Sequence, residues 1–478
     1  MKTPERIETD LCVIGAGSGG LSVAAGAVQM GARVVLIEKG AMGGDCLNTG
    51  CVPSKALLAS AHHAQAQRDG GPFGIAPREP EVDFAAVNAH VRSVIAAIEP
   101  HDSQERFEGL GVRVVRAAAE FISPGEVRAG GQIISAKAFV LATGSAPFTP
   151  PIPGLLETPH LTNESLFEVT ERPRRLVIIG GGPIGLEMAQ AHRRLGSEVV
   201  VLEAAKALGR DDPDLAAVAL ERLRGEGVEI REGARVEAVS GTAGALSVTL
   251  EGGERVEGSH LLVAVGRAPT VDGLGLDAAG IAYDKRGVRT DARLRTTNKR
   301  VYAVGDVANG PGAGWQFTHL AGYHAGIVIR NALFWVPAKA STAHVPRVTY
   351  TDPEIAQVGM TEAEAREALG DRVEVITWPF KDNDRAQAER RTEGLVKAVL
   401  DTSGRIHGAG IVGAQSGELI QIWALALSKK LKVRDLTGMV APYPTLGEVS
   451  KRAAGQFYAP KLFSDRTRGI VRFLLRFS

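Results

Sequence analysis

Short apolar runs alternate with helix-forming stretches along the first part of the chain. Residues 11–14 are an apolar run that leads into a turn, residues 21–30 favour a helix, and residues 34–37 are a second apolar run. Runs of this length between turn signals are typical of buried strands, and a strand, helix, strand order predicts a parallel sheet. The same order returns around the apolar runs at 176–179 and 199–202. The pattern therefore predicts an α/β protein that uses one strand, helix, strand motif twice.

Glycines mark the turn between strand and helix in the first motif. Gly15, Gly17 and Gly20 have the G-x-G-x-x-G spacing, and Glu38 closes the next strand. The first glycine allows a tight turn, the second lets the backbone approach a pyrophosphate, and the third allows close packing of helix on strand. The helix N-terminus then attracts the pyrophosphate, while the acid accepts hydrogen bonds from ribose hydroxyls. We therefore predict a dinucleotide site.

The second motif repeats these positions. Gly180, Gly182 and Gly185 form its turn, and Glu203 closes the strand that follows. In both motifs the acid follows the first glycine by 23 residues, a spacing that two unrelated glycine loops would not share. A second dinucleotide site is therefore predicted.

A cysteine pair lies between the two motifs. Cys46 and Cys51 are five positions apart, and only three cysteines occur in 478 residues, so the pair is more easily a reactive dithiol than part of a disulfide framework. Pro53 suits the first position of a helix. The helix dipole and the cation of Lys55 would then lower the pKa of the Cys51 thiol. The alternative is that both cysteines are small buried residues of a glycine-rich turn.

Two nucleotide sites and a cysteine pair predict electron transfer from one nucleotide to the other and on to sulfur. A flavin accepts a hydride and passes electrons to a disulfide, so FAD is expected in one site and a nicotinamide in the other. Glu203 would bond a ribose 2′-hydroxyl and repel a 2′-phosphate. This favours NAD(H) over NADP(H), although Lys206 lies nearby.

The remainder of the chain predicts further strands and domain boundaries. Three more buried strands are predicted by apolar runs at residues 139–142, 261–265 and 301–304. Four prolines between residues 147 and 153 indicate a stiff connector between domains. Asp306 follows the last run, where open parallel sheets bind ligands, but a helix cap or turn residue explains the acid equally well. After residue 347 the strands alternate polar and apolar positions, which predicts a third domain without a nucleotide motif.

The length and charge of the chain exclude some classes of protein. A chain of 478 residues suits about three domains, and 55 basic against 54 acidic residues give no net field that would favour nucleic acid. No metal site is predicted. The uncharged stretch 11–32 contains six glycines, which argues against a membrane span, and without a recognisable secretory signal we expect a cytoplasmic protein. Residues 470–477 have an apolar helical face flanked by arginines, which could touch a membrane, but packing against its own domain or a second subunit is favoured.

Together these features resemble the class I pyridine nucleotide-disulfide oxidoreductases, the family of dihydrolipoamide dehydrogenase, glutathione reductase and mercuric reductase. The dithiol segment 43–57 and the stretches 142–145, 266–267 and 303–308 carry the resemblance. It implies a homodimer with two Rossmann-like dinucleotide-binding domains and a C-terminal α+β dimerisation domain. The implied domains are an FAD domain split between residues 1–150 and 273–345, an NAD domain at 151–272, and a dimerisation domain at 346–478.

The resemblance also assigns roles to individual residues. Cys46 would be the interchange thiol that attacks substrate sulfur, and Cys51 the thiol beside the flavin. Lys55 and Glu187 would be an ion pair near the reactive edge of the ring, and Asp306 would bond the ribityl chain. Further nucleotide contacts are implied for Ala119, Thr143, Gly144 and Ser145 with FAD, and for Gly266 with NAD.

One segment departs from the family pattern. Lipoamide and glutathione enzymes have His-Pro-Thr followed by Glu, a base dyad that enters the partner subunit's site, whereas this chain has Tyr443 followed by Glu448. A phenol with a pKa of about 10 is only about a thousandth ionised at neutral pH, so Tyr443 is a poor base. Mercuric reductases resemble the chain at this tyrosine, but they finish with a vicinal cysteine pair, and no cysteine follows Cys51 here.

The expected function is FAD-dependent electron transfer from NAD(P)H to a small or protein-borne disulfide, or to a thiol-bound soft metal. In this direction Tyr443 and Glu448 would help to place or protonate the leaving sulfur. One alternative is a true dihydrolipoamide dehydrogenase, which would oxidise dihydrolipoyl groups with NAD. A second alternative is a redox-sensing flavoprotein with little turnover, whose cysteine switch alters a partner contact.

Overall fold

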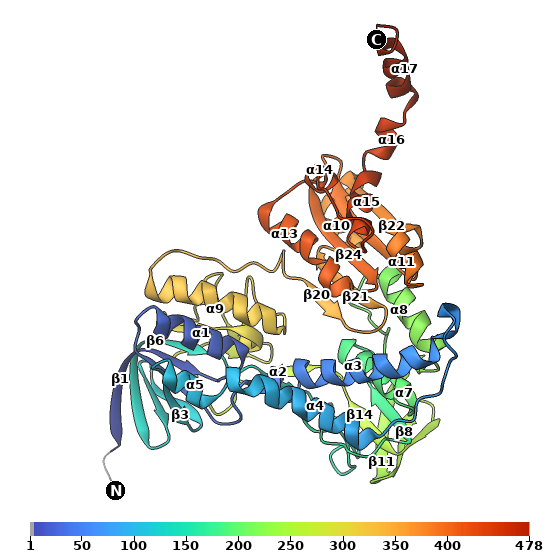
Figure 1. Ribbon diagram of the computed structural model, residues 1–478. Helices are drawn as coiled ribbons and strands as arrows, with labels where there is room; N and C mark the ends of the chain where they lie inside the picture. The colour runs from blue at the N-terminus through green and yellow to red at the C-terminus, as the bar shows by residue number, and fades with distance from the viewer. Residues whose placement is uncertain (1–3, 478) are drawn as a thin grey trace. The chain divides into compact units, whose positions relative to one another are not determined.

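The computed structural model describes residues 4–477 and has the predicted α/β class. The chain forms two compact units (Figure 1). The first unit comprises the chain to Ala204 together with Val228–Thr342, and the second comprises Ala205–Gly227 together with the chain from Ala343. The four-segment domain division given above stays a prediction. Residues 205–227, which that division places in the NAD domain, belong to the second unit.

The first unit is built around a seven-stranded sheet of order β3-β2-β1-β6-β5-β4, with β18 also paired to β6. Its strands are β1 (Glu5–Ile14), β2 (Val34–Glu38), β3 (Arg113–Arg116), β4 (Ala119–Ser123), β5 (Glu126–Ala129), β6 (Gln132–Leu141) and β18 (Val301–Ala303). β1 pairs in parallel with β2 and β6, and β18 pairs in parallel with β6. Segments on either side of the second motif therefore share one sheet.

Helices cover this sheet because they offer small and apolar side chains to it. α1 (Ser18–Gln29) links β1 to β2, and α9 (Thr318–Leu333) lies beside it (Figure 1). Both helices pack their buried residues into one core with β1, β2 and β6. The approach is close, because a Cβ at Gly26 would lie 2.5 Å from the side chain of Ile329. α2 (Gly44–Asn48), α3 (Cys51–Arg68) and α4 (Phe84–Ile98) follow β2.

The second motif forms a separate parallel sheet of order β10-β9-β8-β14 in the same unit. Its strands are β8 (Arg175–Ile179), β9 (Glu198–Glu203), β10 (Glu229–Glu232) and β14 (His260–Val263), with α7 (Pro183–Arg194) between β8 and β9. An antiparallel sheet of β11 (Val236–Thr242), β12 (Ala245–Leu250) and β13 (Arg255–Gly258) packs against it through a shared apolar core.

The second unit contains an antiparallel sheet of order β20-β21-β24-β23-β22. Its strands are β20 (Arg347–Thr349), β21 (Glu354–Gly359), β22 (Val373–Pro379), β23 (Leu395–Asp401) and β24 (Ile406–Gly413). The helices are α8 (Pro213–Gly225), α10 (Glu362–Leu369), α11 (Asp384–Ala388), α12 (Ser416–Leu419), α13 (Gln421–Lys429), α14 (Val433–Thr437), α15 (Glu448–Gln456), α16 (Ala459–Leu462) and α17 (Asp465–Leu474).

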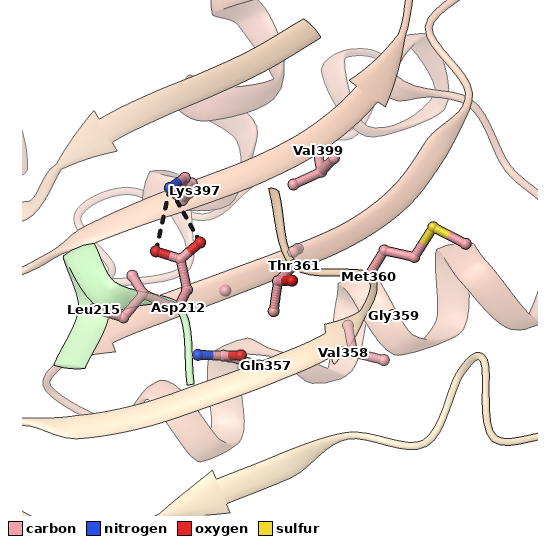
Figure 2. Close-up of a pocket in the computed structure, with 11 residues that line it drawn as sticks. Asp212, Leu215, Gln357, Val358, Gly359, Met360, Thr361, Lys397 and Val399 are labelled. Carbon is pink, nitrogen blue, oxygen red and sulfur yellow. Dashed lines mark hydrogen bonds and ion pairs between the residues drawn. The ribbon is translucent and has the colours of Figure 1, made fainter. Parts of the chain in front are cut away.

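A buried lysine on this sheet forms ion pairs at the N-terminus of α8. The Nζ of Lys397 on β23 lies 2.7 to 3.0 Å from carboxylate oxygens of Asp212, Asp214 and Glu362, and its side chain is 6% exposed. Burial alone would lower the pKa of Lys397, but these hydrogen bonds raise it above its ordinary value. Figure 2 shows the contact of Lys397 with Asp212 beside a small pocket that Leu215 also lines, and the pocket contains none of the predicted site residues. Among the described residues no helix is long and apolar enough to cross a membrane.

Candidate active site

The two glycine turns have the same backbone geometry. Gly15 and Gly180 both require a positive φ, of 104° and 115°. A Cβ at Gly20 would lie 1.8 Å from the carbonyl oxygen of Gly15, and a Cβ at Gly185 would lie 2.0 Å from that of Gly180. Because no side chain fits at these distances, the third glycine of each motif is needed for the helix to approach the turn.

The acids at the ends of β2 and β9 occupy matching positions as well. Glu38 accepts a hydrogen bond from the backbone N–H of Ala16 at 2.6 Å, and Glu203 accepts one from Gly181 at 2.7 Å. Each carboxylate is therefore held beside the turn of its own motif. This is where the ribose of a dinucleotide lies when its pyrophosphate meets the helix N-terminus.

The turns can also accommodate a pyrophosphate. Gly17 and Gly182 are the N-cap residues of α1 and α7, and neither helix has a side-chain cap. A Cβ at either glycine would meet no atom within 4 Å, so the side chain of any other residue would project into the space in front of the helix N-terminus. Free N–H groups facing such a space suit a phosphate. The residues present therefore fit two dinucleotides.

The dithiol segment packs directly on the first glycine turn. The N–H of Gly43 donates to the carbonyl of Ala16 at 3.0 Å, and Gly43 also forms a β-bridge with Gly17. A Cβ at Gly44 would lie 2.8 Å from the Cα of Gly17. The two glycines that precede the cysteines therefore bring the dithiol against the turn that would hold the first dinucleotide.

Cys46 lies in α2 and Cys51 is the first residue of α3. The expectation that Pro53 opens the helix is wrong by two residues, because α3 starts at Cys51 with Gly50 as its N-cap. Proline fits inside the first turn because no N–H there needs an intrahelical acceptor. The shift places the Cys51 thiol directly at the positive end of the helix dipole.

The two thiols have opposite acid–base properties. The hydrogen bond between Cys46 and Cys51 raises the pKa of Cys46 well above its ordinary value and is the largest of the effects that lower the pKa of Cys51, to about 6. The Thr318 hydroxyl, with its oxygen 3.3 Å from the Cys51 sulfur, and the charge of Lys55 lower the pKa of Cys51 further. Desolvation opposes these effects. In the reduced pair Cys51 is therefore the thiolate at neutral pH, and Cys46 keeps its proton.

An ion pair joins the dithiol helix to the second motif. The Nζ of Lys55 on α3 lies 2.7 Å from Oε2 of Glu187 on α7. The side chain of Glu187 is 7% exposed. This is the pairing that the resemblance implied. Thr318, in contrast, was missed as a site residue, because it is 267 positions from Cys51 and no local pattern connects the two.

Asp306 lies in a one-turn helix after β18 and contacts a residue of another predicted segment. The hydroxyl of Ser145 donates to its carboxylate at 2.6 Å, and the guanidinium of Arg267 donates to the same hydroxyl at 2.8 Å. Burial raises the pKa of Asp306, and the bond from Ser145 opposes the rise. Arg267 also lies 3.4 Å from Asp45, next to Cys46. The segments that carry Ser145, Arg267 and Asp306 are thus brought together beside the dithiol segment.

The remaining predicted contacts lie at strand ends and turns of the first unit. The Thr143 hydroxyl donates to the carbonyl of Thr270 at 2.8 Å, and Ala119 is a buried residue at the start of β4. Gly144 and Gly266 have positive φ values of 66° and 123°. These conformations favour glycine because a Cβ is disfavoured there.

Tyr443 and Glu448 lie in the second unit, and each contacts a different side chain. The Tyr443 hydroxyl donates to a carboxylate oxygen of Asp384 at 2.9 Å, whereas Glu448 lies 3.9 Å from Arg452. The bond to Asp384, followed by the charges of Asp384 and Glu448, raises the pKa of Tyr443. Tyr443 is 70% exposed, so its ring remains accessible. Sequence reasoning missed Asp384, which lies 59 positions from the tyrosine.

Two dinucleotide folds with a paired-cysteine helix between them define the class of protein: an oxidoreductase that exchanges electrons between nucleotides and sulfur. Residues 9–325 match the family described as pyridine nucleotide-disulphide oxidoreductase, and residues 345–454 match its dimerisation domain. The chain belongs to this family of FAD-dependent enzymes, as the resemblance predicted.

Individual relatives agree with this membership. The chain is 35% identical over 454 residues to a mercuric reductase of Lysinibacillus sphaericus, covering 94% of this chain and 82% of that protein. It is 37% identical over 461 residues to a dihydrolipoyl dehydrogenase of Thermus scotoductus, covering 93% and 96%. The HOCl-induced flavoprotein disulfide reductase RclA of Escherichia coli is similar in structure, with a TM-score of 0.83 at 30% identity over 93% of this chain and 99% of that chain.

Proposed function

We propose that this enzyme uses electrons from NADH to reduce a disulfide, or a soft metal held by thiols, through Cys46 and Cys51. The feature that supports this best is the asymmetry of the pair: Cys51 begins α3 with its sulfur 3.3 Å from the Thr318 hydroxyl, and its bond with Cys46 lowers the pKa of Cys51 and raises that of Cys46. One cysteine is thus suited to face the cofactor as an anion, and the other to meet a substrate sulfur.

The cofactor in the first motif would be FAD, which when bound accepts a hydride from a nicotinamide and passes an electron pair to a disulfide. The turn at Gly15, Gly17 and Gly20 and the N-terminus of α1 would bind its pyrophosphate, and Glu38 would bind its ribose. Further contacts would come from the half-buried Asp306, from the ion pair of Lys55 with Glu187, and from Ala119, Thr143, Gly144 and Ser145.

The second motif would bind the nicotinamide dinucleotide through Gly180, Gly182, Gly185 and Gly266. Glu203 is held at its turn by the N–H of Gly181 at 2.7 Å, so its carboxylate is in place for a ribose 2′-hydroxyl. A 2′-phosphate would be repelled there. We therefore propose NADH as the preferred donor, to be checked by comparing kcat/KM for NADH and NADPH.

The cysteine pair can supply its own base in the reductive direction. As the Cys46 sulfur attacks one sulfur of the substrate, its proton moves along the existing hydrogen bond to the Cys51 thiolate, and the first substrate thiolate leaves. The departing thiolate then takes that proton, and the Cys51 thiolate attacks the sulfur of Cys46 in the mixed disulfide. The second substrate thiolate leaves and takes a proton from water. One disulfide is consumed, one is formed, and two thiols are released.

The oxidative direction lacks an equally good base. A dithiol substrate must lose protons before it attacks the enzyme disulfide, and Tyr443 keeps its own proton because its bond to Asp384 raises its pKa. Tyr443 instead suits positioning of a substrate sulfur, together with Glu448. We propose that a homodimer brings these residues of one subunit to the dithiol of the other.

We also propose that the enzyme is cytoplasmic, because a cysteine pair in that compartment is more often catalytic than structural.

The test is anaerobic reduction of the purified protein with NADH, followed by parallel challenge with lipoamide, glutathione disulfide and Hg(II). Reoxidation by at least one of them supports the proposal and identifies the class of acceptor. Faster turnover of dihydrolipoamide with NAD than of the reverse reaction contradicts it and favours a lipoamide dehydrogenase. No turnover, with a change of assembly on reduction, favours a redox sensor.

A further inference from the structure

The last helix, α17, exposes apolar side chains along its length. None of its residues is buried, so packing on its own domain, one of the two favoured expectations for this segment, does not cover it. About half or more of each large apolar side chain is exposed, for Ile470 50%, Val471 49%, Phe473 56%, Leu474 59%, Leu475 66% and Phe477 77%. In Figure 1 it follows α16 as the last labelled helix.

The helix has two chemically distinct faces. Arg468, Arg472 and Arg476 recur every four residues and therefore form one row along it. Phe473 and Phe477 stack edge to face, with ring centroids 5.1 Å apart, and the arginine row borders the apolar face to which they belong. The turn continues past Leu474, since the N–H of Leu475 donates to the carbonyl of Val471 at 3.0 Å. The apolar face and the cationic face thus extend together over the same turns.

The charge of this segment differs from that of the rest of the chain. Residues 461–477 contain five cations and a single carboxylate, Asp465. The whole chain has 55 basic and 54 acidic residues. The part outside residues 461–477 therefore has 50 basic and 53 acidic residues and is slightly acidic. Arg468 pairs with Asp465 at 3.6 Å, but within residues 4–477 Arg472 and Arg476 have no carboxylate partner.

We propose that α17 lies on the surface of a bilayer that contains anionic lipids. Exposed apolar side chains and guanidinium groups that are unpaired among the described residues suit a bilayer when they lie on one helix, because a bilayer accepts apolar side chains at the acyl boundary and guanidinium groups among the headgroup phosphates. With 10 residues the helix is about 15 Å long, which is too short to span the hydrocarbon core of a bilayer. It would therefore lie along the membrane–water interface. This inference does not depend on the proposed redox function, and it places the enzyme at a membrane surface.

The test is sedimentation of the full-length, flavin-loaded protein with vesicles of phosphatidylcholine, with and without phosphatidylglycerol. We expect binding to the mixed vesicles, release by high salt, and little binding to phosphatidylcholine alone. The triple variant Arg468→Gln, Arg472→Gln and Arg476→Gln should bind about a hundredfold more weakly, because each cation near an anionic surface contributes about 1 kcal/mol and 1.4 kcal/mol is tenfold. The double variant Phe473→Ser and Leu474→Ser should also lose binding.

Matched substitutions elsewhere on the exposed surface serve as controls. Arg92→Gln, Arg255→Gln and Arg286→Gln together remove the same charge, and Ile75→Ser with Leu156→Ser removes exposed apolar side chains. Both controls should bind as the native protein does, and all variants should keep flavin and the same mass in light scattering. The proposal is overturned if the native protein ignores the mixed vesicles or if the α17 variants bind them normally. A smaller mass of the α17 variants also overturns it, because α17 would then join two copies of the chain.

Discussion

The two glycine motifs are built alike but have different neighbours. Their first glycines have φ values of 104° and 115°, and their acids accept a loop N–H at 2.6 and 2.7 Å. Gly43 and Gly44 pack on the first turn and bring Cys46 and Cys51 against it. The helix of the second motif instead presents Glu187 to Lys55 on the dithiol helix. The two motifs therefore share one local structure, and what packs against each turn distinguishes the copy beside the dithiol from the other.

Removal of the dithiol should have the largest effect. Cys51→Ser or Cys46→Ser should lower disulfide reduction by on the order of a thousandfold or more, as expected when a covalent nucleophile is lost. Flavin should remain bound, because neither sulfur is needed for the glycine turn. Steady-state turnover and flavin absorbance measure the two effects. Cys12→Ala, at a buried cysteine outside the pair, is the control, and equal losses in all three variants would refute the assignment.

Substitution of the third glycine in each motif should separate the two sites. Gly20→Ala places a methyl group 1.8 Å from a carbonyl oxygen and should reduce flavin content, while Gly185→Ala, at 2.0 Å, should keep flavin and raise KM for NADH. Such overpacking costs typically about 1 to 3 kcal/mol, or roughly ten- to a hundredfold in affinity. Gly225→Ala, where a Cβ would meet nothing within 4 Å, should change neither quantity. Identical behaviour of the first two variants would mean that the motifs are not specialised.

The link between the motifs should contribute less. Glu187→Gln removes the carboxylate that lies 2.7 Å from Lys55 but keeps the shape of the side chain. We expect slower reduction of the disulfide by NADH, by about tenfold, since a shift of about 1.4 kcal/mol corresponds to that factor. Rapid-mixing absorbance measures this step, and Glu198→Gln, at an exposed acid on β9, is the comparison. An unchanged rate would show that the pair is structural only.

Loss of the Thr318 hydroxyl should change the pH profile more than the maximal rate. A hydrogen bond to a charged group contributes about 1.5 kcal/mol, so Thr318→Val should raise the pKa of Cys51 by about one unit, from about 6. Cys51 is a thiolate only above its pKa. The valine variant should therefore be less active than the native enzyme between about pH 6 and 7, and equally active at higher pH. Thr318→Ser, which retains a hydroxyl, should behave as the native enzyme. A pH-independent loss in the valine variant would contradict this role.

The smallest effect is expected at Tyr443. Tyr443→Phe removes the hydroxyl that donates to Asp384 but leaves an exposed ring, so reduction should slow only a few-fold, in line with the loss of one exposed hydrogen bond. Asp384→Asn should have a similar effect on the reaction and should lower the pKa of the tyrosine, which a phenolate absorbance titration measures. A loss as large as that of Cys46→Ser would show that Tyr443 is an essential proton donor to the leaving sulfur.

Much of this arrangement could be predicted because it is encoded locally. The strands and helices of both motifs follow from apolar runs bounded by glycines, and the pyrophosphate turns follow from spacings within a few residues. Contacts between distant positions could not be predicted by periodicity. Thr318 meets Cys51, and Asp384 meets Tyr443, only through tertiary packing. The start of α3 was misplaced because proline is tolerated throughout a first turn.

The most direct test of the central claim is alkylation of the enzyme with iodoacetamide, before and after anaerobic reduction with NADH, followed by peptide mass spectrometry at a series of pH values. We predict that Cys46 and Cys51 react only after reduction, and that the labelling of Cys51 titrates near pH 6. Equal labelling before and after reduction, or a Cys51 titration in the ordinary thiol range near pH 8.5, would contradict the account.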